Sequence, residues 1–410
     1  MRRLGIAMMT ALAVIACNSN DLSPVSQNGA TNTGGGAGDL GPNDPGPGGV
    51  RFAASGEALA LTGYAFPPGK PDDPVFVDGW DVRFTHLLTT IDKVTLYDNP
   101  DMAPGDQSRT GGIAAQLSGP WAVDLARSDT TYLPGKGGPG ELAVPFASVK
   151  IGNDGNPLST DGTRYGFGFD IVVANADAKK VNLAGDANAD YAEMVSNACA
   201  VLYVGTATFK GDKTDAACYP ADRKGWPDVV NFRLCFKSPT SYVNCQNPDN
   251  DPARPFEGEE HQRGIALRQD ASIIAQVTVH TDHPFWDSVI HDSPAHFDQF
   301  AARAVGQSAD AGAAPTVTLE STKGLDYTAI TDATGKALSW RYCVDPPTDA
   351  HAKLTGEMKF DPQRVPHATN ANPASGLRDY YDFTTYNQST QGHLDSDGLC
   401  FVKRSYASPL

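Results

Sequence analysis

Residues 80–88 read Trp-Asp-Val-Arg-Phe-Thr-His-Leu-Leu and show a two-residue apolar repeat. Successive side chains of an extended chain point to opposite faces, so one face of this run carries Trp80, Val82, Phe84, His86 and Leu88. Apolar positions that recur with this period predict a half-buried β-strand. A second β-rich run follows almost at once and predicts another strand over Ile91–Tyr97.

Seven other short runs along the chain have the same β-rich character. They are Ala58–Tyr64, Ala143–Ile151, Gly166–Val173, Ala200–Phe209, Val229–Phe236, Ala271–Val279 and Thr316–Leu319. Clusters of Gly, Pro, Asn and Asp separate many of these runs, and the chain holds 41 glycines and 30 prolines, which fit many turns. The sequence therefore predicts a mainly β protein. We expect an antiparallel β-sandwich, either one large or two packed, with one or two short helices.

Helical patterns are few. The clearest is Pro294–Val305, for which Ser293 is a suitable N-cap, Pro294 a suitable first helical residue and Gly306 a stop. Segment 196–256 carries four cysteines and many polar turns, which indicates a disulfide-stapled insertion on the β body.

The N-terminus has the pattern of an export signal. Two arginines precede an apolar stretch from Leu4 to Ala16 that is too short to span a bilayer as a stable helix. The closing residues, Val-Ile-Ala-Cys at 14–17, resemble the lipobox of bacterial lipoproteins. That resemblance implies removal of residues 1–16 as a signal peptide and lipidation of Cys17. The acyl chains would anchor the protein in a membrane, and Asn18 after the cysteine favours the outer membrane.

Composition then divides the rest of the chain. Residues 17–50 begin with the lipidated cysteine; from residue 18 on they hold nine Gly and four Pro with no aromatic, Lys or Arg residue, so we expect a flexible tether. Residues 51–410 are expected to form the β-rich extracytoplasmic domain, in the periplasm or facing the cell surface. The net charge of −16 makes nucleic acid an unsuitable partner, whereas an envelope protein partner stays open.

Six cysteines remain after Cys17, and an even number in an exported chain predicts disulfides. They are Cys199, Cys218, Cys235, Cys245, Cys343 and Cys400. Six cysteines allow fifteen connectivities. We expect sequence neighbours to pair, as Cys199–Cys218, Cys235–Cys245 and Cys343–Cys400.

Four of the nine histidines fall within seventeen residues, namely His280, His283, His291 and His296. A strand that ends near Val279 would place His280 and Asp282 on one face, while Pro284 would break the strand beside His283. Imidazole and carboxylate are common ligands for zinc and copper. The sequence therefore predicts a transition-metal site built from His280 and His283 with Asp282 as a ligand or support. His291 or His296 would complete it. The alternative is a structural turn whose histidines bind no ion.

Three other features have weaker functional interpretations. His86 is predicted to point into the core as a hydrogen-bonded residue, with a role as a remote metal ligand as the alternative. The acidic stretches 186–190 and 395–398 place oxygen ligands at alternate positions, so calcium is considered, but neither completes an EF-hand loop. Four aromatic side chains near the C-terminus indicate a half-buried strand or a binding patch: Tyr380, Tyr381, Phe383 and Tyr386.

The sequence contains no catalytic motif. It has no Gly-x-Ser-x-Gly elbow, no P-loop and no dinucleotide fingerprint, so we do not assign it as an enzyme. Three functions stay open: a membrane-anchored binding lipoprotein that holds a transition metal, a structural or partner-binding surface lipoprotein without a ligand, and a metal-dependent hydrolase.

Overall fold

The longest strand among the described residues is β2, Trp80–Tyr97, which joins the two runs predicted separately. The computed structural model describes residues 44–128, 132–249, 256–307, 313–346, 353–360 and 377–404. Strand β2 is long enough to pair with β9 along its first part and with β7 along its second. It is therefore the central strand of the larger sheet.

The larger sheet collects strands from most of the chain. Its main path runs through β14 (Thr316–Thr318), β10 (Val229–Phe236), β9 (Val201–Phe209), β2, β7 (Arg164–Ile171), β11 (Thr240–Val243) and β17 (Phe401–Arg404). Four short strands pair beside this path: β3 (Ile113–Leu117), β4 (Trp121–Asp124), β8 (Lys179–Lys180) and β12 (Ile265–Ala266). Segment 196–256 thus supplies β9, β10 and β11 to the sheet itself.

The smaller sheet positions the histidines. Its order is β16 (Gly398–Leu399), β15 (Gly392–Leu394), β13 (Ile273–Val279), β1 (Val50–Ser55), β6 (Leu142–Val149) and β5 (Leu133–Pro134). Strand β13 is parallel to β1 and antiparallel to β15. The pairs β10–β14 and β4–β8 are parallel too, so both sheets are mixed, whereas we expected them to be antiparallel.

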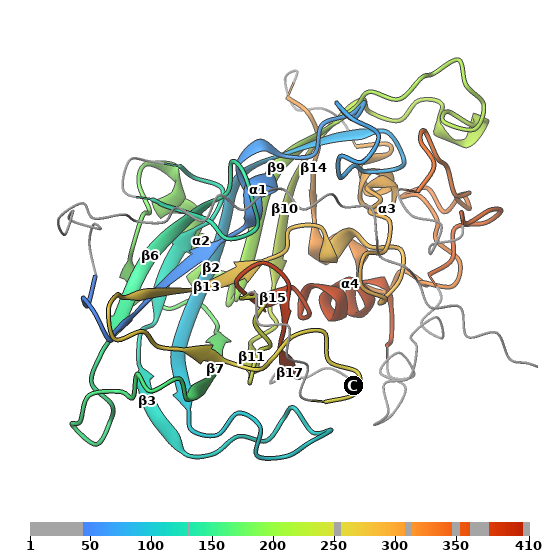
Figure 1. Cartoon of the computed structure of the whole chain (residues 1–410). Coiled ribbons are helices and arrows are strands. Elements are labelled where there is room, and N and C mark those ends of the chain that lie inside the picture. The colour runs from blue at the N-terminus through green and yellow to red at the C-terminus, as the bar shows by residue number, and fades with distance from the viewer. Residues whose placement is uncertain are drawn as a thin grey trace, which may run out of the picture. The chain divides into compact units, whose positions relative to one another are not determined.

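The two sheets share one apolar core, as a sandwich requires. The rings of Phe52 on β1 and Phe167 on β7 stack with centroids 6.0 Å apart, and buried apolar side chains from both sheets form a single cluster. Figure 1 shows β13 of the smaller sheet crossing in front of β2 of the larger one. The prediction of a mainly β protein with few short helices is confirmed.

A β-bulge in β2 changes the predicted strand face. The register of the β2–β9 pair shifts between Phe84 and His86, so the alternation is broken at Thr85. Leu87 then packs in the main core, while Leu88 packs in a second apolar cluster beneath a helix. His86 is buried as predicted, but it lies beyond the bulge and not in line with Trp80, Val82 and Phe84.

Three segments predicted as strands or loops are helices or parts of helices. Helix α1 (Glu57–Thr62) replaces the strand expected from Ala58, because its alanines and leucines are good helix formers. Helix α2 (Asp186–Asn197) contains the acidic stretch 186–190, whose carboxylates suit the first turn of a helix. Helix α4 (Tyr380–Gln388) contains the aromatic patch, and the Asp379 side chain caps it by accepting a hydrogen bond from the Asp382 amide.

The predicted helix at 294–305 is shorter than expected. Helix α3 covers Asp298–Ala301 and continues as the 3₁₀ turn η3, Ala302–Ala304, before Gly306 takes a positive φ. Ser293 is not its N-cap, because the carboxylate of Asp78 accepts the amides of Phe297 and Asp298 instead. The other 3₁₀ turns given for the described residues are η1 (Ala221–Arg223), η2 (His283–Phe285) and η5 (Leu319–Thr322).

All six body cysteines form disulfides, but the expected neighbour pairing is wrong. The bonds are Cys199–Cys235, Cys218–Cys343 and Cys245–Cys400. Sheet pairing explains two of them. Cys199 precedes β9 and Cys235 lies near the end of the antiparallel partner β10, while Cys245 follows β11 and Cys400 precedes its partner β17.

The described residues, from 44 onward, belong to one compact unit. The predicted signal peptide, Cys17 and the tether up to residue 43 lie outside the described residues. In the part of the chain that the structure describes, no helix is long and apolar enough to cross a membrane.

Candidate metal centre

The histidine cluster forms where β13 ends. His280 follows the last residue of β13, and three residues later His283 begins the 3₁₀ turn η2. His291 lies in the segment between η2 and α3. The fourth ring belongs to His393 on β15, which is in register with Thr278 of β13. The antiparallel pair of strands therefore brings a C-terminal histidine beside the three that are close in sequence.

Helix α4 and the residues that follow it contact η2 and hold it in place. The Thr384 hydroxyl donates a hydrogen bond to the carbonyl oxygen of Pro284 at 2.5 Å. The Thr390 hydroxyl is 2.8 Å from Nδ1 of His283. The ring of Trp286 lies against the His283 ring, with centroids 3.7 Å apart. These contacts fix the direction of the His283 imidazole.

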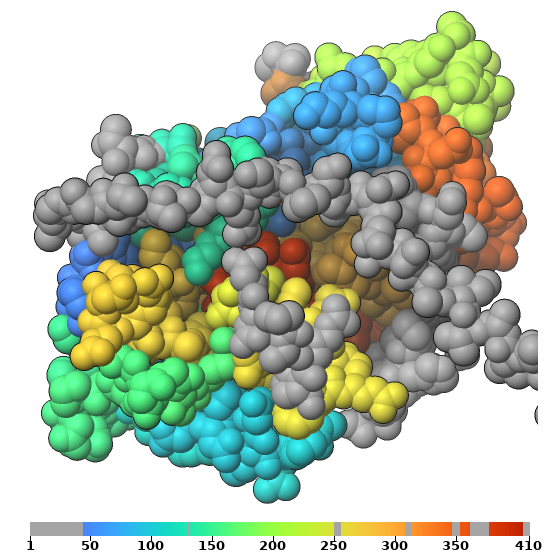
Figure 2. All heavy atoms as spheres, viewed as in Figure 1, coloured from blue at the N-terminus to red at the C-terminus, as the bar shows by residue number. Residues whose placement is uncertain are grey.

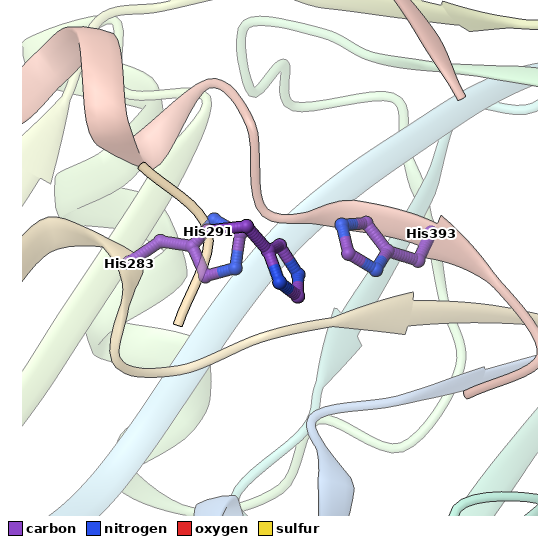
Figure 3. A group of neighbouring side chains, drawn as sticks. All are labelled: His283, His291 and His393. Carbon is purple, nitrogen blue, oxygen red and sulfur yellow. The ribbon is translucent and has the colours of Figure 1, made fainter. Parts of the chain in front are cut away.

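Two overlapping groups of side chains have the spacing of a metal site. One ligand atom from each of His283, His291 and His393 lies within 4.8 Å of the others, and the same holds for His280, Asp282 and His283. The three rings of the first group come from separate segments and converge (Figure 3). Their centroids are 5.9 Å apart for His283–His291, 5.6 Å for His291–His393 and 5.7 Å for His283–His393.

Two ring nitrogens in this cluster are buried and have no hydrogen-bond partner among the described residues. They are Nε2 of His283 and Nδ1 of His393. Buried polar atoms in proteins are nearly always paired, and an unpaired one costs about 1–3 kcal/mol. Both nitrogens are thus available as ligands, so the residues present fit a metal ion.

The protonation states of the two buried rings suit ligation. Burial lowers the pKa of His283 well below its usual value, and the neighbouring rings of His280, His393 and His291 lower it further. Burial also lowers the pKa of His393 well below its usual value, with the same direction from His280 and His291. Both imidazoles are therefore neutral at pH 7, which is the form that binds metals.

The other two rings are biased by carboxylates. Burial alone would lower the pKa of His280, but the charges of Glu57, 3.6 Å away, and Asp282 outweigh it and raise that pKa. Burial would also lower the pKa of His291, which is half-exposed. The Asp292 carboxylate, 3.1 Å away, outweighs burial and raises that pKa. Nε2 of His280 also lies 3.0 Å from the carbonyl oxygen of Ser396. Because their pKa values are raised, these two rings hold a proton more tightly than usual. Each must release that proton before it can bind an ion.

A pocket opens beside the first group. It has a volume of about 340 Å³, and its walls include His283, His291 and His393 together with Trp286 and Val289. Figure 2 shows part of the red C-terminal segment set back between yellow and brown segments. The half-exposed His291 is the most accessible of the three rings, whereas His283 and His393 line the pocket but are almost fully buried.

His296, predicted as a possible ligand, makes its contacts elsewhere. Its fully buried ring has Nε2 3.4 Å from Asp287 and Nδ1 4.0 Å from Asp78, and it packs against Trp340 and Tyr342. It belongs to neither metal-binding group. The Asp78 carboxylate, which accepts the amides of Phe297 and Asp298, holds the segment after His296 apart from the run that carries His291.

His86 belongs to a separate polar network. Its Nδ1 is 2.6 Å from Asp124 on β4, and its Nε2 is 3.4 Å from Asp186 and 3.9 Å from Asp190 on α2. Asp190 is also paired with Arg233 at 2.7 Å. The predicted alternative, a remote ligand of the histidine cluster, has no support in these contacts. The stretch 186–190, considered for calcium, uses its carboxylates here.

The second stretch considered for calcium is the turn between β15 and β16. The Asp395 carboxylate accepts the Gln276 amide at 3.0 Å and lies 3.1 Å from the Lys136 ammonium group. These partners make it a structural turn residue.

His393 was missed by the sequence analysis. It is a lone histidine in the run Gln-Gly-His-Leu, 113 positions after His280, and no local pattern marks it. Only the pairing of β13 with β15 reveals it.

Comparisons with protein-family models, with curated proteins and with solved structures find no match to this chain. The function must therefore be argued from the site.

Proposed function

We propose that this protein is an extracytoplasmic lipoprotein that holds one transition-metal ion through His283, His291 and His393. The observation that carries the proposal is the convergence of these ligand nitrogens within 4.8 Å from three separate segments. Two of the rings are buried, neutral and each have a nitrogen without a partner among the described residues. His280 and Asp282 form the overlapping group that shares His283, and they supply further ligands or support.

The donor set indicates the class of metal. Imidazole nitrogens with one carboxylate suit zinc and copper, whereas calcium prefers oxygen ligands alone. A divalent ion would satisfy the two unpaired nitrogens, and Asp282 would contribute a negative charge. Affinity for a given nitrogen site generally rises from the earlier first-row metals to Cu²⁺ and is lower for Zn²⁺. We therefore expect copper(II) to bind more tightly than zinc.

The proposed location rests on the N-terminal sequence and on the cysteines. Residues 14–17 resemble a lipobox, and the three disulfides of the body are typical of proteins exported to an oxidising compartment. The lipid on Cys17 would attach the protein to a membrane, with the outer membrane favoured. A Cys17→Ser variant should lose the fatty acid label and accumulate as precursor or be released. Mature, membrane-bound Cys17→Ser protein would contradict the anchor.

Calorimetric titration tests the metal proposal directly. Chelator-stripped protein should bind one equivalent of zinc or copper. His291→Ala removes a half-exposed ligand with little risk to folding, and it should weaken binding at least tenfold, because one of three ligands is lost. His393→Gln should have the same effect. The matched control is His261→Ala, which removes a partly exposed histidine outside both groups.

The outcomes separate the candidate functions. Equal binding by the wild type and His291→Ala, or no binding by either, would refute the proposed site. That result would favour the second function considered from the sequence, which is a structural or partner-binding lipoprotein without a ligand. A weakening by His261→Ala as large as that by His291→Ala would place binding outside the cluster.

Metal-dependent hydrolysis is the second candidate, and the pocket beside the cluster is the observation that favours it. Hydrolytic metal sites keep an accessible coordination position, whereas structural sites are closed by protein ligands. Zinc-loaded protein would then hydrolyse a chromogenic ester faster than the His291→Ala variant does. Equal rates would exclude this candidate.

A further inference from the structure

The pocket beside the histidine cluster combines three imidazoles with a mainly apolar lining. Apart from the three histidines, its lining is mainly apolar and includes Trp286, Val289, Leu399, Val402 and the disulfide-bonded Cys400. Its volume of about 340 Å³ is at the lower end of the range for small-molecule sites. An apolar cavity of this kind suits a ligand with a flat hydrocarbon body.

The polar side chains of the pocket are already engaged. Gln107 donates its side-chain amide to the carbonyl oxygens of Asn244 and Leu399, at 2.9 and 2.8 Å. Gln246 accepts the amides of Glu260 and His261, both at 2.9 Å. These hydrogen bonds fix the two side chains in the pocket wall. The three histidines are the lining residues that can hold an ion, so a polar head group is expected to bind at the histidine wall.

Charge decides which head group fits that wall. Among the described residues, no Lys, Arg, Asp or Glu lines the pocket, so Asp282 and Glu57 are not part of its lining. A divalent ion held by the three imidazoles would face the mainly apolar part of the pocket with at least one coordination position that these rings do not fill. The positive charge of the ion is costly there unless an opposite charge pairs with it. A carboxylate provides that charge and an oxygen ligand.

We propose that the pocket binds a small organic acid with a planar apolar body, whose carboxylate contacts the ion held by His283, His291 and His393. This inference rests on the proposed metal function. The carboxylate compensates the charge of the ion, and the body packs against Trp286 and Val289. Binding exchanges no electrons and breaks no bond.

Benzoate and acetate share a head group and differ in the apolar body, so together they test the proposal. Cobalt(II) is loaded first, because its absorption spectrum reports changes in its ligands. Benzoate should change the spectrum of the cobalt-loaded protein and bind at least tenfold more tightly than acetate, as expected for burial of an aromatic ring. Metal-free protein should bind neither acid.

Each result has a separate meaning. Failure to take up cobalt would refute the proposed metal function. Uptake of cobalt with no spectral change on adding benzoate, or with equal affinities for benzoate and acetate, would overturn the pocket proposal and leave the metal function standing.

A pocket-filling variant then locates the apolar body. Val289→Phe narrows the pocket at a half-buried position, and Val229→Phe adds the same ring at an exposed position on β10. Both variants are first checked for the cobalt spectrum, which shows that they still bind the metal. Val289→Phe should then lose the preference for benzoate over acetate, and Val229→Phe should keep it. Retention of the preference by both variants would place benzoate outside this pocket.

Discussion

The imidazole rings of His280 and His393 lie with centroids 4.2 Å apart, although 113 positions separate them in the chain. Their pKa values shift in opposite directions, because carboxylates surround His280 whereas His393 is buried beside other rings. The cluster therefore contains both a ring biased toward its charged form and a ring held neutral. An incoming ion meets a site that is only partly protonated.

Zinc should stabilise the fold, and acid should weaken this effect. An ion that binds only the folded state adds about 2.7 kcal/mol at a hundredfold excess over its dissociation constant. The pKa values of His280 and His291 are raised above 6.5. As the solution is acidified, the affinity for zinc should therefore begin to fall while the pH is still above 6.5. Thermal unfolding with and without zinc at pH 8 and pH 6 measures this. An identical rise in melting temperature at both values would contradict it.

His86 should stabilise the fold more at acid than at alkaline pH. Its hydrogen bond with Asp124 and the charges of Asp124 and Asp186 raise its pKa in the folded state. The stabilisation is therefore complete below the unfolded pKa near 6.5 and is lost as the pH rises through the higher folded value. In urea unfolding, His86→Gln should cost about 1 kcal/mol or more at pH 6 and less at pH 9. A cost that grows with pH would reverse this assignment.

The bonding pattern of the cysteines should be found in the isolated protein. Peptide mapping without reductant should give Cys199–Cys235, Cys218–Cys343 and Cys245–Cys400, and alkylation of unreduced, denatured protein should label none of these six. Replacing Cys245 and Cys400 by alanine should lower the free energy of unfolding by about 2–5 kcal/mol. Recovery of a Cys199–Cys218 peptide would contradict the sheet pairing.

Phe285 should couple core packing to the metal site. It is fully buried and its ring lies 5.1 Å from Phe76 and 5.5 Å from Phe300, while η2 also carries His283. Phe285→Ala should cost about 3–5 kcal/mol in unfolding and also weaken zinc binding. The control Ile113→Ala changes an exposed apolar side chain and should cost under about 0.5 kcal/mol. If Phe285→Ala destabilises the protein but leaves its zinc affinity unchanged, core packing at Phe285 does not influence the proposed metal site.

The strands were predictable where one face of the chain is apolar, and the site was only partly so. The alternation from Trp80 to Phe84 gave β2, but the bulge at Thr85 depends on the partner strand β9, which no local pattern reveals. Helix α1 was misread because its short apolar run fits a strand as well as a helix. The cluster around His280 was visible as a local excess of histidine. His393 was not, because strand pairing is a long-range property.

The parallel pairing of β1 with β13 also sets an order of assembly. Val50 is in register with Ile273, and β13 in turn needs β15, which begins at Gly392. A chain made from its N-terminus must keep β1 without this neighbour until more than half of the sequence has been synthesised, and contacts so distant in sequence form slowly. The proposed metal site can be complete only after His393 has been synthesised. Metal loading would then be among the last steps of maturation, and a chain truncated before β15 would leave the cluster without its fourth ring.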